Sequence, residues 1–220
     1  MLEILLIFSL TAQPEVLVGE SQATRAEMHE RFTRATLIQT AIINGNLEGA
    51  RHWAKQLATI APKEPAFADV RSRFAALAGE IAEARTLSQA AFKTGRLANS
   101  CGACHELHGI QSFRFESSTP APDGKTVPEA MARHIWAADR LWEGLVGRSE
   151  GSWMAGASAL VKSSLEPAQL ENPDQETIAL LAEKVRESGS EALQSARWES
   201  RAALYGRLLN TCAECHKSYR

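Results

Sequence analysis

Two cysteine–histidine motifs are the residues of this sequence with the clearest chemical potential. Each has two cysteines separated by two residues and followed at once by a histidine: Cys101, Cys104 and His105, and then Cys212, Cys215 and His216. Cysteines three positions apart share one face of a helix, so their thiols can reach two neighbouring vinyl groups of a porphyrin. The next histidine then offers a neutral imidazole nitrogen to the iron. The spacing predicts two covalently attached c-type haems.

Other uses of a cysteine pair fit the sequence less well. A zinc site would take its four ligands from one closed fold, whereas these pairs lie 111 residues apart. A thioredoxin-like redox pair is expected between strands and a helix, and no alternating strand pattern stands out. A disulfide within one pair would be strained and would leave the histidine unexplained. Haem attachment is therefore the leading interpretation.

Each motif ends one copy of an internal repeat. Residues 95–105 read GRLANSCGACH and residues 206–216 read GRLLNTCAECH, a shift of 111 residues. Upstream, apolar residues recur with the same spacing at a shift of 103: Met28, Phe32, Ala35, Ile38 and Ile42 in the first copy, and Met131, Ile135, Ala138, Leu141 and Leu145 in the second. The chain therefore consists of two similar halves, and the second half carries an insertion before its motif.

The apolar spacing and the composition both favour helices. Steps of four and three residues place these side chains on one stripe of an α-helix. Aromatic residues make up only 6% of the 220 residues, which disfavours sheet. We expect four helices in the first half (21–43, 46–62, a third opened by Pro65, and 87–105) and four in the second (128–146, 150–163, 174–187 and 190–217). The predicted fold is all-α, with two tandem antiparallel four-helix bundles and a haem motif on the last helix of each.

The predicted domains are a first haem-binding bundle at 20–109, a linker at 110–127 and a second bundle at 128–220. The linker is indicated by the segment SSTPAPDGKTVP, with three prolines and small polar residues. Residues 1–18 are interpreted as a signal peptide, because the apolar run from Leu2 to Leu10 is too short to cross a bilayer. The alternative is an apolar element of the fold. Covalent haem attachment favours export, so we expect a periplasmic protein without a membrane span.

The ligand at the sixth position of each iron decides what the haem can do. Met28 and Met131 occupy the same repeat position on a helix that can cross the haem face. They are our candidate distal ligands, and the alternative is that both are core residues. His29 and His134 compete with them, although these two histidines do not occupy equivalent positions.

Arg96 and Arg207 also match in the repeat, five residues before the first cysteine of each motif. Arginine binds carboxylates through two parallel hydrogen bonds, so both residues are candidate partners of the haem propionates. The alternative is a solvated helix face.

A haem motif on the last helix of a four-helix bundle resembles the class II c-type cytochromes, which are cytochrome c′ and its low-spin, methionine-ligated relatives. The ending CAECHKSYR is similar to their C-terminal motif, in which a basic residue follows the histidine by four, here Arg220. The first motif departs from it, with Gly109 at that place. The resemblance implies a methionine ligand early in the first helix, where Met28 and Met131 lie approximately, or an apolar distal residue as in cytochrome c′. With its two motifs the chain would be a tandem diheme form, which is less usual for a class whose members are mostly single bundles that often dimerise.

The sequence leaves three functions open. They are electron transfer in the periplasm, binding of gases such as NO or CO, and service as the haem subunit of a larger oxidoreductase. A formal net charge of −2 gives no field directed at nucleic acid. No catalytic triad, Walker loop or dinucleotide fingerprint occurs, so we expect an electron carrier rather than a stand-alone enzyme. The expected partners are redox proteins. The chain itself is expected to form a homodimer or to be a subunit of a redox complex.

Overall fold

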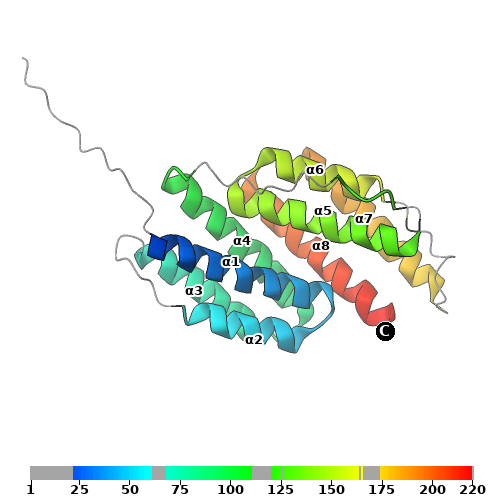
Figure 1. The fold of residues 1–220 in the computed structure, drawn as a ribbon. Helices are drawn as coiled ribbons and strands as arrows, with labels where there is room; N and C mark the ends of the chain where they lie inside the picture. Colours follow the sequence, from blue (N-terminus) through cyan, green and yellow to red (C-terminus); the bar gives the residue numbers. More distant parts are fainter. Residues whose placement is uncertain are drawn as a thin grey trace, which may run out of the picture.

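The computed structural model describes residues 22–60, 68–110, 120–124, 126–163, 165 and 174–219. Its regular elements there are all helices: α1 (Gln22–Ile43), α2 (Leu47–Ala58), α3 (Ala68–Ala82), α4 (Leu87–Leu107), α5 (Val127–Gly147), α6 (Glu150–Val161), α7 (Gln175–Gln194) and α8 (Trp198–Tyr219). The described residues contain no strand, so the predicted all-α class is confirmed (Figure 1). The proposed signal peptide and Arg220 lie outside the described residues, as does most of the proposed linker.

Local sequence sets the beginnings of several helices. The side chain of Asn46 accepts a hydrogen bond from the backbone N–H of Gly49 and so caps α2. At the start of α5, Thr126 and Glu129 exchange side-chain and backbone hydrogen bonds in a capping box, and Pro128 occupies the first turn. These helix starts are therefore encoded by a few neighbouring residues.

The predicted boundary between the last two helices was wrong. The sequence suggested helices at 174–187 and 190–217, whereas α7 continues to Gln194 and α8 begins at Trp198. Gly189 lies inside α7, where an added Cβ would come within 2.8 Å of the Cβ of Leu160 in α6. This glycine therefore serves a close approach between two helices and does not end one.

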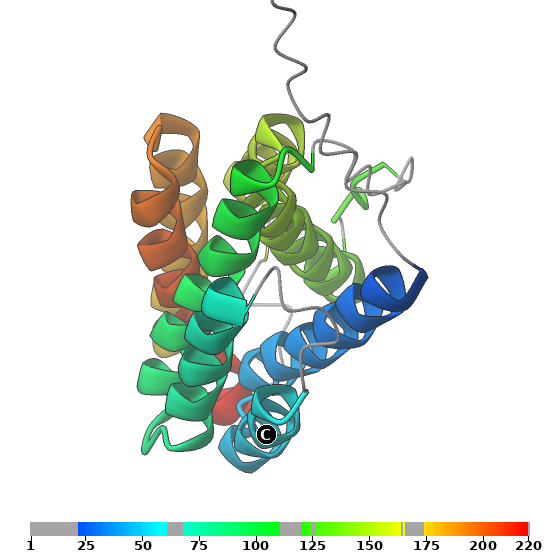
Figure 2. The same cartoon turned by 90° about the vertical axis from the view of Figure 1, so that its left-hand side faces the viewer.

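The helices of the described residues form two groups, α1 to α4 and α5 to α8, which meet along α4 and α8 (Figures 1 and 2). At this crossing an added Cβ at Gly95 would collide with the carbonyl oxygen of Ala202. An added Cβ at Gly206 would lie 2.8 Å from the Cα of Phe92 and 3.2 Å from the carbonyl oxygen of Ala91. Gly95 and Gly206 are equivalent in the repeat, and so are Ala91 and Ala202. The same two small residues therefore bring the backbones together from both sides.

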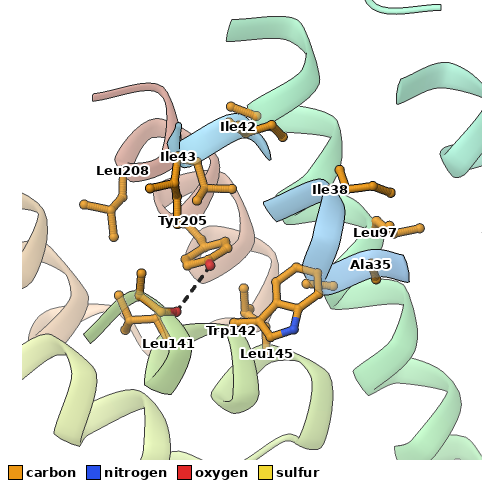
Figure 3. Packing of buried hydrophobic residues seen from close by; sticks show 14 of the residues in the cluster. Ala35, Ile38, Ile42, Ile43, Leu97, Leu141, Trp142, Leu145, Tyr205 and Leu208 are labelled. Atoms are coloured by element: carbon orange, nitrogen blue, oxygen red, sulfur yellow. Dashed lines mark hydrogen bonds between the residues drawn. The ribbon is translucent and has the colours of Figure 1, made fainter. Parts of the chain in front are cut away.

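The main hydrophobic core contains side chains from both groups of helices (Figure 3). Ile38 of α1, Leu141 of α5 and Tyr205 of α8 are all fully buried in it. The ring centroids of Trp142 and Tyr205 lie 6.0 Å apart. The hydroxyl of Tyr205 donates to the carbonyl oxygen of Ala138 at 3.2 Å, which satisfies a polar group in an otherwise apolar region. The two halves of the sequence thus share one core.

Across the described ranges, none of the helices combines the length and the apolar character that a bilayer crossing requires.

Candidate functional site

Both cysteine–histidine motifs lie near the C-terminal ends of helices, the first on α4 and the second on α8. All four cysteines are free thiols in partly exposed residues. Burial of the sulfur, together with the second cysteine of the same motif, raises the pKa of Cys101 to about 12 and that of Cys212 to about 12. Burial also raises the pKa of Cys104 and Cys215. At neutral pH these groups are therefore neutral thiols and not reactive thiolates.

A cavity opens beside the first motif, and we call it cavity 1. It is lined by all three motif residues on α4 and by Met28 of α1, which is one of the predicted distal ligands. Most of the other lining residues are apolar, among them Phe32, Ala35, Phe74, Trp142 and Val146. The competing candidate His29 is exposed and is not among the lining residues. The fold thus brings together the two thiols, the imidazole and the methionine that were predicted to share one site.

A second cavity, cavity 2, lies beside the motif on α8. The described residues of its wall include Cys212, Cys215 and His216, together with both distal candidates of the second half, Met131 and His134. Apolar residues of α5 and α7 complete this wall, among them Ile135, Ala138, Leu181, Ala182 and Val185. Both predicted haem sites therefore coincide with cavities.

Each first helix contributes to both cavities. Helix α1 supplies Met28 to cavity 1 and Ile43 to cavity 2, while α5 supplies Met131 to cavity 2 and Val146 to cavity 1. Ile43 and Val146 are equivalent in the repeat. On α5, Ala138 of cavity 2 and Trp142 of cavity 1 are one turn apart, about 6 Å along the helix axis. The cavities are therefore neighbours, and each needs a helix from the other half.

The imidazole of His105 is held by a hydrogen bond from the other half of the chain. Its Nδ1 lies 2.8 Å from the carbonyl oxygen of Val146, and the residue is buried. Val146 belongs to the last turn of α5, where carbonyl groups have no partner within the helix. A proton on Nδ1 that is donated to this carbonyl leaves Nε2 as the basic nitrogen. Metal-binding histidines are typically oriented in this way.

The turn after α5 holds the second half against the first motif. Arg148 ends α5 with a φ of 52°, a left-handed conformation that is costly for a residue other than glycine. Its guanidinium donates to Asn99 Oδ1 at 2.8 Å and to Glu106 Oε2 at 3.3 Å, on either side of the motif on α4. At the equivalent position after α1, Gly45 adopts a φ of 67° without a side chain. The side-chain contacts of Arg148 compensate for its backbone conformation.

Cavity 2 contains a second imidazole besides that of its motif. His134 forms a hydrogen bond through Nε2 with the hydroxyl of Ser163. Burial, with a contribution from the nearby His216, lowers the pKa of His134 to about 4. The side chain is therefore neutral at neutral pH, as a metal ligand must be. Met131 and His134 both remain candidates for the distal position of this cavity.

The two arginines predicted to contact propionates lie on the surface. Arg96 is 3.6 Å from Glu80 Oε2, and Arg207 forms a close ion pair with Glu191. Neither is among the residues that line the cavities. Arg31 lines cavity 1 instead, three residues after Met28 on the same helix. Repeat matching missed it because the second half has a histidine there.

Comparison with protein-family models, with curated proteins and with solved structures finds no match to this chain. The cofactor that these residues can hold is therefore inferred from the thiols and the imidazole of the motifs. Two neutral thiols and one oriented imidazole beside an apolar cavity fit a covalently attached haem. Within the part of the chain that the structure describes, no three His, Cys, Asp or Glu side chains converge on a point as in a closed zinc site.

Proposed function

We propose that this chain is a diheme c-type cytochrome, similar to the class II cytochromes, that transfers electrons between redox proteins in the periplasm. The observation that carries the proposal is the position of His105. Its Nδ1 is bonded to a backbone carbonyl, and it stands next to two thiols at an apolar cavity. This arrangement suits a porphyrin anchored by thioethers with its iron bound by Nε2.

The residues of each half have separable tasks in this proposal. Cys101 and Cys104 anchor the first porphyrin and His105 binds its iron, while the bound haem supplies the redox-active iron. The apolar wall around Met28 keeps water from the iron and limits solvent reorganisation when its charge changes. We infer that each group of four helices is one haem-binding bundle, that residues 110–127 join the two bundles and that residues 1–18 direct export.

Gas binding is the second candidate, and the wall of cavity 1 favours it. Phe32 and Ala35 lie on α1 beside Met28 and offer only apolar surface. An iron that faces this surface without a methionine bond would have an open coordination position for NO or CO.

The test is expression with a periplasmic cytochrome c maturation system, followed by a haem count per chain and optical spectra of both oxidation states. We expect two haems, low-spin spectra and a methionine-to-iron charge-transfer band. Met28→Ala with Met131→Ala should remove that band, because it removes both proposed sulfur ligands. Met154→Ala is the matched control, since this methionine of α6 is not among the residues lining either cavity.

Other outcomes would redirect or end the proposal. High-spin spectra that change on addition of CO or NO would favour gas binding over electron transfer. A band that persists in the double variant would refute the methionine ligands. Colourless protein from a working maturation system would refute haem attachment altogether.

A further inference from the structure

Two arginines from different helices meet in the wall of cavity 1. Arg31 of α1 and Arg71 of α3 have side chains that are only 7% and 6% exposed. Both approach the same oxygen of Glu27, which is fully buried. The distance from Arg31 Nε to Glu27 Oε1 is 2.9 Å, and that from Arg71 Nε is 3.4 Å. Two guanidinium groups thus share one carboxylate at the edge of an apolar cavity.

The guanidinium of Arg31 has hydrogen-bonding capacity to spare. Its Nη2 donates to the carbonyl oxygen of Ile60 at 2.8 Å, and its Cζ lies 5.2 Å from the ring centroid of Phe74. Its Nη1 is buried, and no described residue accepts a hydrogen bond from it. A buried charged donor without an acceptor is costly. The site is therefore suited to one more anionic oxygen.

A carboxylate is the ligand that suits these two guanidinium groups. Guanidinium groups bind carboxylates with charge-assisted and often paired hydrogen bonds. The porphyrin proposed for cavity 1 carries two propionate carboxylates, and Cys101, Cys104 and both arginines line the same cavity. The remaining lining residues are largely apolar, so a propionate that enters the cavity needs these cations.

We propose that Arg31 and Arg71 form a carboxylate subsite that holds a propionate of the haem at the first motif. This inference rests on the proposed function, because the porphyrin is the ligand. Glu27 positions the two guanidinium groups and balances part of their charge.

The subsite belongs to one haem only. The residue equivalent to Arg31 in the second half is His134, and the described residues that line cavity 2 include no arginine or lysine. Cationic groups near an iron favour its reduced form, which carries one positive charge less. The subsite therefore raises the midpoint potential of the haem in cavity 1 and makes no such contribution to the haem in cavity 2.

The experiment compares the two midpoint potentials in holoprotein variants by spectroelectrochemistry. Arg31→Met and Arg71→Met should each lower the potential of the first haem and leave that of the second unchanged. Glu27→Gln should shift the first potential in the opposite direction, because it removes a negative charge. Arg34→Met is the matched control: its side chain is 25% exposed, it pairs with Glu30 and it does not line cavity 1. Resonance Raman spectra should show a shifted propionate mode in the arginine variants only.

Each remaining outcome has a defined meaning. Two attached haems with unchanged potentials and propionate modes would overturn the subsite, while the proposed function would stand. The propionate mode could instead be unchanged while the wild type binds azide or nitrite and Arg31→Met does not. That result would overturn the propionate subsite in favour of a site for a free anion. Should Arg31→Met fail to fold, Arg31→Lys tests the same point, because it keeps the charge and loses the paired geometry. A shifted propionate mode is then expected, and an unchanged mode counts against the proposal. Absence of haem from the wild type would refute the proposed function itself.

Discussion

The orientation of His105 depends on a residue 41 positions further along the chain. A histidine next to a cysteine pair supplies a ligand atom only if the correct nitrogen carries the lone pair. The carbonyl of Val146 secures this by accepting from Nδ1, so the tautomer is set before any metal arrives. In the proposed holoprotein the same hydrogen bond also makes the imidazole a stronger donor to the iron.

A buried carboxyl group on α5 gives a prediction for the pH dependence of stability. Glu143 is 8% exposed, and burial raises its pKa to about 7, although Arg140 opposes this shift. The ordinary value is 4.5, so between about pH 4.5 and pH 7 this carboxyl binds more protons in the folded chain than in the unfolded chain. The contribution of Glu143 to the free energy of unfolding should therefore fall as the pH rises through this window, while the lowered pKa of His134 contributes with the opposite sign up to about pH 6.5.

Glu143→Gln should remove this contribution, because the amide does not ionise, so the free energy of unfolding of the variant relative to the wild type should rise from about pH 4.5 to pH 7. The measurement is urea unfolding of wild type and variant at several pH values from 4.5 to 7.5. Glu48→Gln removes an exposed acid and is the control. Identical pH profiles for the wild type and Glu143→Gln would show that this carboxyl does not cause the dependence.

At the scale of the helices, the crossing of α4 and α8 offers a matched pair of substitutions. Gly95→Ala should destabilise the protein by about 1–3 kcal/mol, because the added Cβ would collide with the backbone of Ala202. Gly79→Ala, in the interior of α3, has no atom within 4 Å of the added Cβ. It should be stabilising by about 0.4–1 kcal/mol through higher helix propensity. Thermal and chemical unfolding of both variants provides the comparison, and equal effects would refute the close crossing.

The helices show which structural features can be predicted from the sequence. The caps at Asn46 and Thr126 were predictable because capping involves residues three positions apart. The extent of α7 was not, since Gly189 looks the same whether it ends a helix or admits a neighbour. The cysteine–histidine motifs and the methionines opposite them follow from spacing and repeat. Arg31 and Arg71 could not be paired in advance, because only the packing of α1 and of α3 against α2 and α4 brings them to one cavity.

At the scale of the whole molecule, the shared core predicts that neither half is stable by itself. Residues 20–109 alone would expose the face of α4 that α8 covers, and would lose Val146, which holds His105. We expect this fragment to unfold at a lower temperature than the full chain or to self-associate. Coexpression of the fragments 1–115 and 116–220, each with an export signal, should restore a complex. Circular dichroism and light scattering measure both properties, and a monomeric half as stable as the full chain would contradict this expectation.

The matching of Gly95 with Ala202 and of Gly206 with Ala91 has a consequence for how such a chain diverges. Two identical subunits related by a twofold axis must present the same patch to each other, so every mutation appears twice. A single chain whose two halves, or lobes, repeat each other is free of this constraint, because a mutation alters one lobe alone. An arginine can then stand where the other lobe has a histidine, and in the proposed diheme protein the two chemically identical haems would acquire unequal affinities for an electron. Under that proposal the duplication would give electron transfer a preferred direction.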